Sequence, residues 1–234
     1  MLLLGLAGGA CGAEPRAGVS RVWPELGTMM SAAAWVNAPP GADSARLVRA
    51  LNAAHESVDR IDSLLQQHVR IAAIDSARRD VWQRTGVMLI ADSIMGGYAL
   101  DRAALALAPV VDSALLDIGG QFYWIAPPAR PTNRRVGIPD PDNTLRVLAG
   151  IEMRSGAVST RSQRNAPPGR ARSVTVLAAD GLTANAWAAA LLELGCDRAL
   201  TESHGMSVVC ADSAGVRWTT DLQNRVSLPI GRAP

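Results

Sequence analysis

The chain has 234 residues, of which 48% are hydrophobic and 19% are charged. This composition excludes a disordered chain, and the length fits one large domain. No apolar run reaches the roughly 18 residues that a membrane-spanning helix needs. All 23 basic residues are arginines, so no lysine can act as a general base or form a Schiff base. The net charge of +2 comes without a basic run, which predicts a protein that does not bind nucleic acid.

The amino terminus carries a short apolar stretch, residues 2–10, which Cys11 follows directly. A stretch of this kind that ends in small residues before a cysteine resembles the export signal of a bacterial lipoprotein, whose cysteine becomes lipidated. No arginine precedes the stretch, so a plain secretory signal or an unpacked tail remains an alternative. With either signal, we expect the bacterial cell envelope: a lipid-anchored, periplasmic or secreted protein whose only membrane contact is a lipid anchor.

The other two cysteines, Cys196 and Cys210, fit two interpretations. Outside the cytosol they can form a disulfide, but two cysteines are just as often separate buried thiols. The three histidines, His55, His68 and His204, lack the spacing of a zinc site. A metal centre built from cysteine and histidine is therefore not expected.

The first predicted elements are a strand over residues 28–37 and a long helix over residues 44–68. The strand follows a turn at Gly27 and ends before a pair of prolines. In the helix, apolar residues recur at steps of three and four: Leu47, Leu51, Ala54, Val58, Ile61 and Leu65. This pattern predicts an amphipathic helix of about six turns that packs on a sheet.

Glycine pairs and alternating segments mark the rest of the chain. Gly96-Gly97 stands before a predicted helix over residues 98–108, where it fits a tight turn or a backbone approach to a phosphate. Thr183 is the predicted N-cap of a helix that ends at Leu194. Further strands are predicted over residues 113–117, 121–126, 134–138, 145–153, 156–160, 173–178, 206–211 and 215–220.

Strands and helices that follow no strict βαβ rhythm predict an α+β fold. We expect a single domain with a mixed or antiparallel sheet flanked by helices. The predicted domain covers residues 24–222. A signal segment and linker over residues 1–23 precede it, and a tail over residues 223–234 follows it.

Six short segments, each weak alone, occur in an order that is informative as a set. They are LGT at 26–28, GGYALDRA at 96–103, DIGG at 117–120, RVGIPDP at 135–141, GAVST at 156–160 and SVTVLAADGLTANAWAAALLELG at 173–195. Over about residues 24–212, this series resembles the FAD:protein FMN transferase family, also called the ApbE or flavin transferase family.

The resemblance implies an ApbE-like fold and an activity. Members of the family bind FAD in an elongated cleft with a magnesium ion at the pyrophosphate, and they transfer FMN to a Thr or Ser of a target protein, releasing AMP. In such a reaction a cation neutralises developing charge while the acceptor hydroxyl is oriented for attack. The implied cofactors are FAD and Mg²⁺, and the implied partners are FAD and an acceptor flavoprotein.

The resemblance also assigns site residues. The implied cofactor-binding positions are Leu26, Thr28, Asp92, Tyr98, Asp101, Gly119, Gly120 and Thr160. The implied metal positions are the backbone carbonyl of Met95 and the side chains at Asn185 and Ala189. For Tyr98, ordinary core packing is the alternative.

The sequence departs from the family pattern at the positions that carry the chemistry. Asn185 stands where the family has Asp, Ala189 where it has Thr, and Gly96 where it has Lys. Arg161 and Ser162 replace a Ser-Gly pair, and the family's later histidine segment is missing. An Asn oxygen can ligate magnesium but brings no charge, and an Ala side chain cannot ligate. Two functional interpretations therefore stand: a divergent FMN transferase, or a non-catalytic, lipid-anchored module that binds flavin or protein. An unrelated α+β envelope protein is a third.

Overall fold

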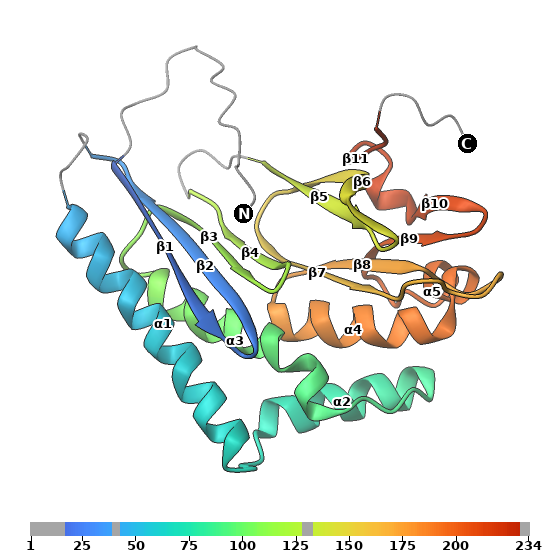
Figure 1. Cartoon of the computed structure of the whole chain (residues 1–234), viewed down its shortest axis with the longest axis horizontal. Coiled ribbons are helices and arrows are strands. Elements are labelled where there is room, and N and C mark those ends of the chain that lie inside the picture. Colours follow the sequence, from blue (N-terminus) through green and yellow to red (C-terminus); the bar gives the residue numbers. More distant parts are fainter. Residues whose placement is uncertain (1–16, 39–42, 128–132, 230–234) are drawn as a thin grey trace.

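The computed structural model describes residues 17–38, 43–127 and 133–229. These residues form two antiparallel sheets and a layer of helices (Figure 1). The larger sheet has the strand order β1-β2-β3-β4-β7-β8-β9-β10. Its strands are β1 (Ala17–Glu25), β2 (Thr28–Val36), β3 (Ser113–Ile118), β4 (Gln121–Ile125), β7 (Gly156–Ser162), β8 (Ser173–Ala178), β9 (Ser207–Asp212) and β10 (Gly215–Trp218).

The smaller sheet has three strands in the order β11-β6-β5. They are β5 (Arg134–Asp140), β6 (Asn143–Met153) and β11 (Val226–Ser227). This sheet lies on the side of the large sheet that the helices leave open (Figure 1).

The helices lie below the large sheet in Figure 1. They are α1 (Ser44–Gln66), α2 (Ala72–Thr85), α3 (Ala91–Leu107), α4 (Gly181–Leu194) and α5 (Cys196–Thr201), followed by the 3-10 turn η1 (Thr220–Leu222). Helix α3 lies between α1 and α4, and α4 packs on β7 and β8. No helix of the described ranges is long and apolar enough to cross a membrane.

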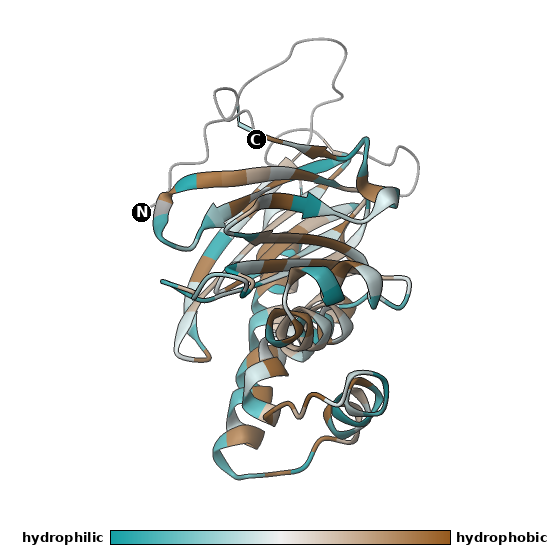
Figure 2. Cartoon of the chain, turned by 90° about the vertical axis from the view of Figure 1, so that its right-hand side faces the viewer, coloured by the Kyte–Doolittle hydropathy of each residue, from teal (hydrophilic) through white to brown (hydrophobic). Residues whose placement is uncertain are grey.

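Two apolar cores result from these layers. One lies between the helices and the large sheet and includes Leu51, Leu100 and Trp187. The other lies between the two sheets and includes Trp124 and Ile151. In Figure 2, apolar segments run along the stacked strands and along the helices below them. Strands β7, β8 and β9 of the large sheet are therefore buried on both faces, whereas β1 at its edge is mostly exposed.

The predicted α+β fold is confirmed, and most predicted elements lie within a few residues of the observed ones. The chain forms one α+β unit with antiparallel sheets and helices. The strand over 173–178 is found with the predicted bounds, and the long helix ends two residues early, at Gln66. Helix α2 was not predicted. The folded part also exceeds the predicted domain, because β1 begins at Ala17 and β11 pairs with β6.

The glycine pair at 96–97 lies inside helix α3, so the predicted turn there and the predicted helix start after it are wrong. The reason is a close crossing of two helices. A Cβ atom on Gly97 would lie 2.2 Å from the backbone oxygen of Gly181, the first residue of α4. Glycine costs helix stability, but here only glycine lets the two backbones approach this closely.

The N-cap of α4 is Asp180 rather than the predicted Thr183. The side chain of Asp180 accepts a hydrogen bond from the backbone N–H of Thr183, at 2.7 Å. This is the usual arrangement in which an N-cap oxygen satisfies a free donor of the first turn. Thr183 therefore lies within the helix.

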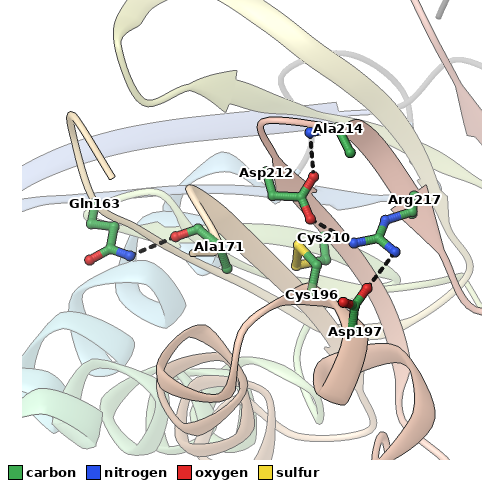
Figure 3. The surroundings of a disulfide bond; sticks show 8 residues. All are labelled: Gln163, Ala171, Cys196, Asp197, Cys210, Asp212, Ala214 and Arg217. Atoms are coloured by element: carbon green, nitrogen blue, oxygen red, sulfur yellow. Dashed lines mark hydrogen bonds and ion pairs between the residues drawn. A yellow bond between two sulfur atoms is a disulfide. The ribbon is translucent and has the colours of Figure 1, made fainter. Parts of the chain in front are cut away.

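Cys196 and Cys210 form a disulfide, which decides between the two interpretations of these cysteines. The bond joins the start of α5 to strand β9 (Figure 3). Cys11 lies outside the described residues.

Candidate functional site

A polar cleft of about 500 Å³ opens where α1, α3, β7 and two hairpin turns meet. It is lined by Leu26, Thr28, Asp62, Leu65, Gln66, Asp92, Ser93, Met95, Gly96, Ile118, Gly119, Gln121 and Arg161. These residues come from five separate stretches of the chain, which the fold brings together.

Two tight turns form one edge of the cleft. Leu26-Gly27 joins β1 to β2, and Gly119-Gly120 joins β3 to β4. All four residues have positive φ, from 50° to 85°, as two-residue hairpin turns require. Leu26 is unusual there, because a bulky side chain at positive φ is strained. The two turns touch, since the backbone N–H of Gly119 donates to the carbonyl of Met29 at 3.2 Å.

Five of the predicted site residues line this cleft: Leu26, Thr28, Asp92, Met95 and Gly119. The structure thus brings together positions from the LGT, GGY and DIGG segments. Their distance in sequence hides this proximity, which the family pattern had implied.

Four other predicted cofactor-binding residues do not line the cleft: Tyr98, Asp101, Gly120 and Thr160. Tyr98 is half-buried and packs against the helix-side core, which agrees with the alternative interpretation of it. Gly120 lies in the turn, where its backbone N–H donates a hydrogen bond to Oδ1 of Asp117 at 2.8 Å. Burial raises the pKa of Asp117.

Asp101 holds the start of helix α4. Its two carboxylate oxygens accept the backbone N–H groups of Gly181, at 2.5 Å, and Leu182, at 2.9 Å. Burial raises the pKa of Asp101 to about 6, although these hydrogen bonds act in the opposite direction. The side chain borders a separate depression of about 350 Å³, together with Tyr123 and Asp180. In this structure Asp101 is an anchor between α3 and α4.

Thr160 and Arg161 point to opposite faces of β7, as successive residues of a strand do. The hydroxyl of Thr160 bonds to that of Thr175 on the neighbouring strand, at 2.9 Å. Arg161 instead reaches the helix side, where it meets Asn185 of α4. The cleft is therefore lined by Arg161 and not by the predicted Thr160.

The guanidinium of Arg161 is hydrogen-bonded to Asn185, one of the predicted metal positions. Its Nε and Nη2 donate to Oδ1 of Asn185 at 3.0 and 2.6 Å, and Nη2 also donates to the backbone oxygen of Ser93. Ser159 lies 3.5 Å from the same Oδ1. Asn185 is fully buried, and its Nδ2 has no hydrogen-bond partner in the described structure.

These residues do not fit a divalent metal ion. The one oxygen that Asn185 offers already accepts from a cationic group, and Ala189, one turn further along α4, has no ligand atom in its side chain. Magnesium prefers charged oxygen ligands and would be repelled by the guanidinium. Across the described residues, no group of three or more His, Cys, Asp and Glu side chains is arranged to hold a metal.

A second exchange concerns Gly96, where the family has Lys. A Cβ atom on Gly96 would lie 2.9 Å from Nε2 of Gln121, so the amide of Gln121 occupies the space where a side chain would begin. Oε1 of Gln121 is buried without a hydrogen-bond partner in the described ranges.

Sequence reasoning noted Arg161 only as a departure from a pattern and did not place it in the site. Two signals were available. Arg161 lies next to Thr160 in a strand, so it faces the other side, and an added cation accompanies the loss of a carboxylate at Asn185. Asp62, Gln66 and Gln121 carried no such signal, because only the fold places them at the cleft.

Comparisons with known proteins agree with this geometry. The fold is similar to the flavin transferase ApbE from Vibrio cholerae (14% identity, TM-score 0.69, 90% of this chain and 100% of that chain). It is also similar to the ApbE protein from Thermotoga maritima (17%, 0.64, 89% and 99%) and to the apo flavinyl transferase ApbE from Pseudomonas stutzeri (14%, 0.67, 90% and 97%). The comparison with curated proteins gives no match. At these identities the solved structures establish a shared fold.

The sequence itself goes further than the fold. It matches the ApbE family model over residues 43–166, which is more than half of the chain and runs from the start of α1 to just beyond β7. The matched segment contains Asp92, Met95, Gly119 and Arg161, so it includes much of the cleft. The chain therefore belongs to the ApbE family.

Proposed function

We propose that this protein binds FAD in the cleft and acts as a flavin transferase, moving FMN from FAD to a Ser or Thr hydroxyl of an acceptor flavoprotein. The observation that carries the proposal is the cleft itself: three of the family segments meet there, in a member of a family of flavin transferases. Its volume of about 500 Å³ is in the range of sites that bind small molecules.

The proposed reaction is a displacement at phosphorus. The acceptor hydroxyl oxygen forms a bond to the FMN phosphorus, and the bond from that phosphorus to the bridging oxygen breaks. The hydroxyl proton leaves, and AMP departs with the electron pair of the broken bond. The protein contributes by holding the diphosphate and excluding water from it.

A second candidate function is favoured by one specific observation. Arg161 donates two hydrogen bonds to Oδ1 of Asn185, at the position that the family uses for its metal. This arrangement supports a protein that holds a flavin dinucleotide without transferring FMN. Both candidates share the cleft and differ only in turnover.

One titration separates the two candidates. The protein is titrated with FAD while flavin fluorescence and AMP release are followed, with and without an acceptor that carries a D-x-x-[ST]-[GA]-[ST] motif. Acceptor-dependent AMP release and a flavin mass on the acceptor support the transferase. Saturable binding without AMP supports the binding module, and absence of binding contradicts both.

We propose further that the protein works at the cell envelope and is lipid-anchored at Cys11. The Cys196–Cys210 disulfide supports a compartment that is oxidising. In a bacterial host, Cys11→Ser should move the protein from the membrane fraction to the soluble fraction. An unchanged distribution would contradict the anchor.

A further inference from the structure

Arg161 is the one cationic side chain among the described residues that line the cleft. The other charged lining residues are two carboxylates, Asp62 and Asp92. Asp62 already accepts a hydrogen bond from Nε2 of Gln66, at 2.8 Å. The cation of the cleft thus comes from β7, and its two carboxylates come from α1 and α3.

Among the residues that the structure describes, no carboxylate pairs with the positive charge of Arg161. Its two acceptors, Oδ1 of Asn185 and the backbone oxygen of Ser93, are both neutral. Within the described residues, none of the ion pairs closer than 4.0 Å involves Arg161. Burial lowers the pKa of the group, but an arginine keeps its proton at working pH. A partly buried charge without a counter-ion among the described residues is unfavourable, so the site is suited to an anion.

The hydrogen-bond inventory shows which atoms remain for that anion. A guanidinium has five N–H donors, and three of those on Arg161 point to Asn185 and Ser93. Nη1 makes no hydrogen bond in the described part of the chain and is not among its buried polar atoms without a partner. Nη1 is therefore accessible from the cleft, while Nε and Nη2 hold the group in place.

We propose that the Arg161 guanidinium replaces the divalent metal of this site and binds the diphosphate of the dinucleotide directly, so that binding needs no metal ion. The inference rests on the proposed function, since it assumes that FAD enters this cleft. A planar, permanently charged guanidinium suits phosphate oxygens, and such hydrogen bonds are about twice as strong as neutral ones. Asp62 and Asp92 repel a diphosphate, which leaves it the β7 side.

The test measures the affinities of the protein for FAD, ADP and riboflavin by calorimetry, each in EDTA and in excess magnesium chloride. In the wild-type protein, FAD and ADP should bind equally well in both buffers. Arg161→Met removes the charge and keeps the aliphatic stem. This variant should lower the affinities for FAD and ADP by about 10- to 100-fold, as expected for the loss of charged hydrogen bonds. The affinity for riboflavin should not change.

A second variant keeps Arg161 but pairs its charge with a carboxylate, so that the charge is less available to a bound diphosphate. Asn185→Asp places a carboxylate where Oδ1 now lies 2.6 Å from Nη2, which gives Arg161 a buried counter-ion. This variant should weaken FAD and ADP by about tenfold and raise the melting temperature. If Arg161 had a purely structural role, Asn185→Asp would raise the melting temperature without changing the affinity for FAD or ADP. This variant also keeps the test decisive if Arg161→Met does not fold.

The control is Arg79→Ala, which removes the same charge from the exposed face of α2 and should leave all three affinities unchanged. Magnesium-dependent FAD binding, or an equal loss of riboflavin affinity in Arg161→Met, would overturn the inference but not the proposed function. The same holds if neither cleft variant weakens FAD. If ADP binds through Arg161 and FAD does not, the proposed function fails and the arginine site stands. If neither FAD nor ADP binds, both are wrong.

Discussion

Two arginines of the large sheet, one on its edge strand β10 and one on the central strand β7, have different electrostatic surroundings. Arg217 on β10 donates from Nη1 to Asp197 at 2.7 Å and from Nη2 to Asp212 at 2.6 Å. It lies between these carboxylates and beside the disulfide (Figure 3). Arg161 on β7 instead bonds to the neutral oxygens of Asn185 and Ser93.

The comparison separates an arginine that stabilises the fold, Arg217, from one that is suited to bind a ligand, Arg161. Arg217 is paired twice, and those carboxylates raise its pKa. Its charge is already neutralised, so it ties α5 to β9 and β10. Hydrogen bonds hold the Arg161 side chain in place while no carboxylate of the described residues pairs with it, which is the state that a binding group requires. Substitutions in each region can test this division.

The largest expected effect comes from the helix crossing beneath the cleft. Gly97→Ala puts a methyl group 2.2 Å from the backbone oxygen of Gly181, and neither backbone can move alone. We expect more than about 3 kcal/mol of lost stability in chemical denaturation, together with weaker FAD binding.

The matched control for this substitution is Gly137→Ala on β5. There the added Cβ meets Val147 at 3.4 Å, an ordinary contact. We expect stability within about 1 kcal/mol of wild type. Similar losses in both variants would contradict the close crossing of α3 and α4.

The next effect concerns the disulfide region. Replacing Cys196 and Cys210 together by Ala opens a loop with a sequence separation of 14. The loss of this constraint should lower the free energy of unfolding by about 2 to 3 kcal/mol. FAD affinity should stay unchanged, because the cleft lies elsewhere on the sheet. Loss of FAD binding in a folded double variant would show that the two regions are coupled.

A smaller effect depends on pH and concerns Asp101. Burial raises the pKa of this carboxyl from 3.8 to about 6, so the folded protein holds the proton more tightly than the unfolded chain does. The resulting stabilisation is complete below pH 3.8 and is lost as the pH rises to about 6.

Asp101→Asn removes this titration. Between pH 4 and pH 7, wild type should lose about 2 to 2.5 kcal/mol relative to the variant, measured as unfolding free energies in denaturant. Groups shared by the two proteins cancel in this difference. A difference that is constant with pH would contradict the raised pKa.

The smallest effect is expected at Arg217. Its side chain is 40% exposed, so Arg217→Ala should lower stability by about 1 kcal/mol or less. ADP affinity should not change, in contrast to Arg161→Met. If both variants weakened ADP equally, the effect would come from net charge, and the distinction between the two arginines would be lost.

The sequence predicted the fold well where its signals are local. The three- and four-residue steps of α1 and the alternation of β8 are each read within one element. The order of the short segments then indicated which positions share a cleft. Leu26, Asp92 and Gly119 reached it as implied.

Predictions failed where an outcome depends on two elements that are distant in sequence. Gly97 disfavours a helix by local propensity, but the neighbouring backbone at Gly181 requires it. The role of Arg161 depends on strand direction and on the reach of its side chain to Asn185. A pattern of residue types gives neither the direction of a strand nor the distance that a side chain must span.

The two cores give this protein a pair of internal fluorophores. Trp187 is 3% exposed in the helix-side core, and Trp124 is fully buried between the sheets, with the Arg134 guanidinium 4.4 Å from its ring centroid. Indole emission shifts when water reaches the ring, so each residue reports on its own layer. Replacing all but one of the six tryptophans in turn would therefore show whether the two layers melt together or one before the other.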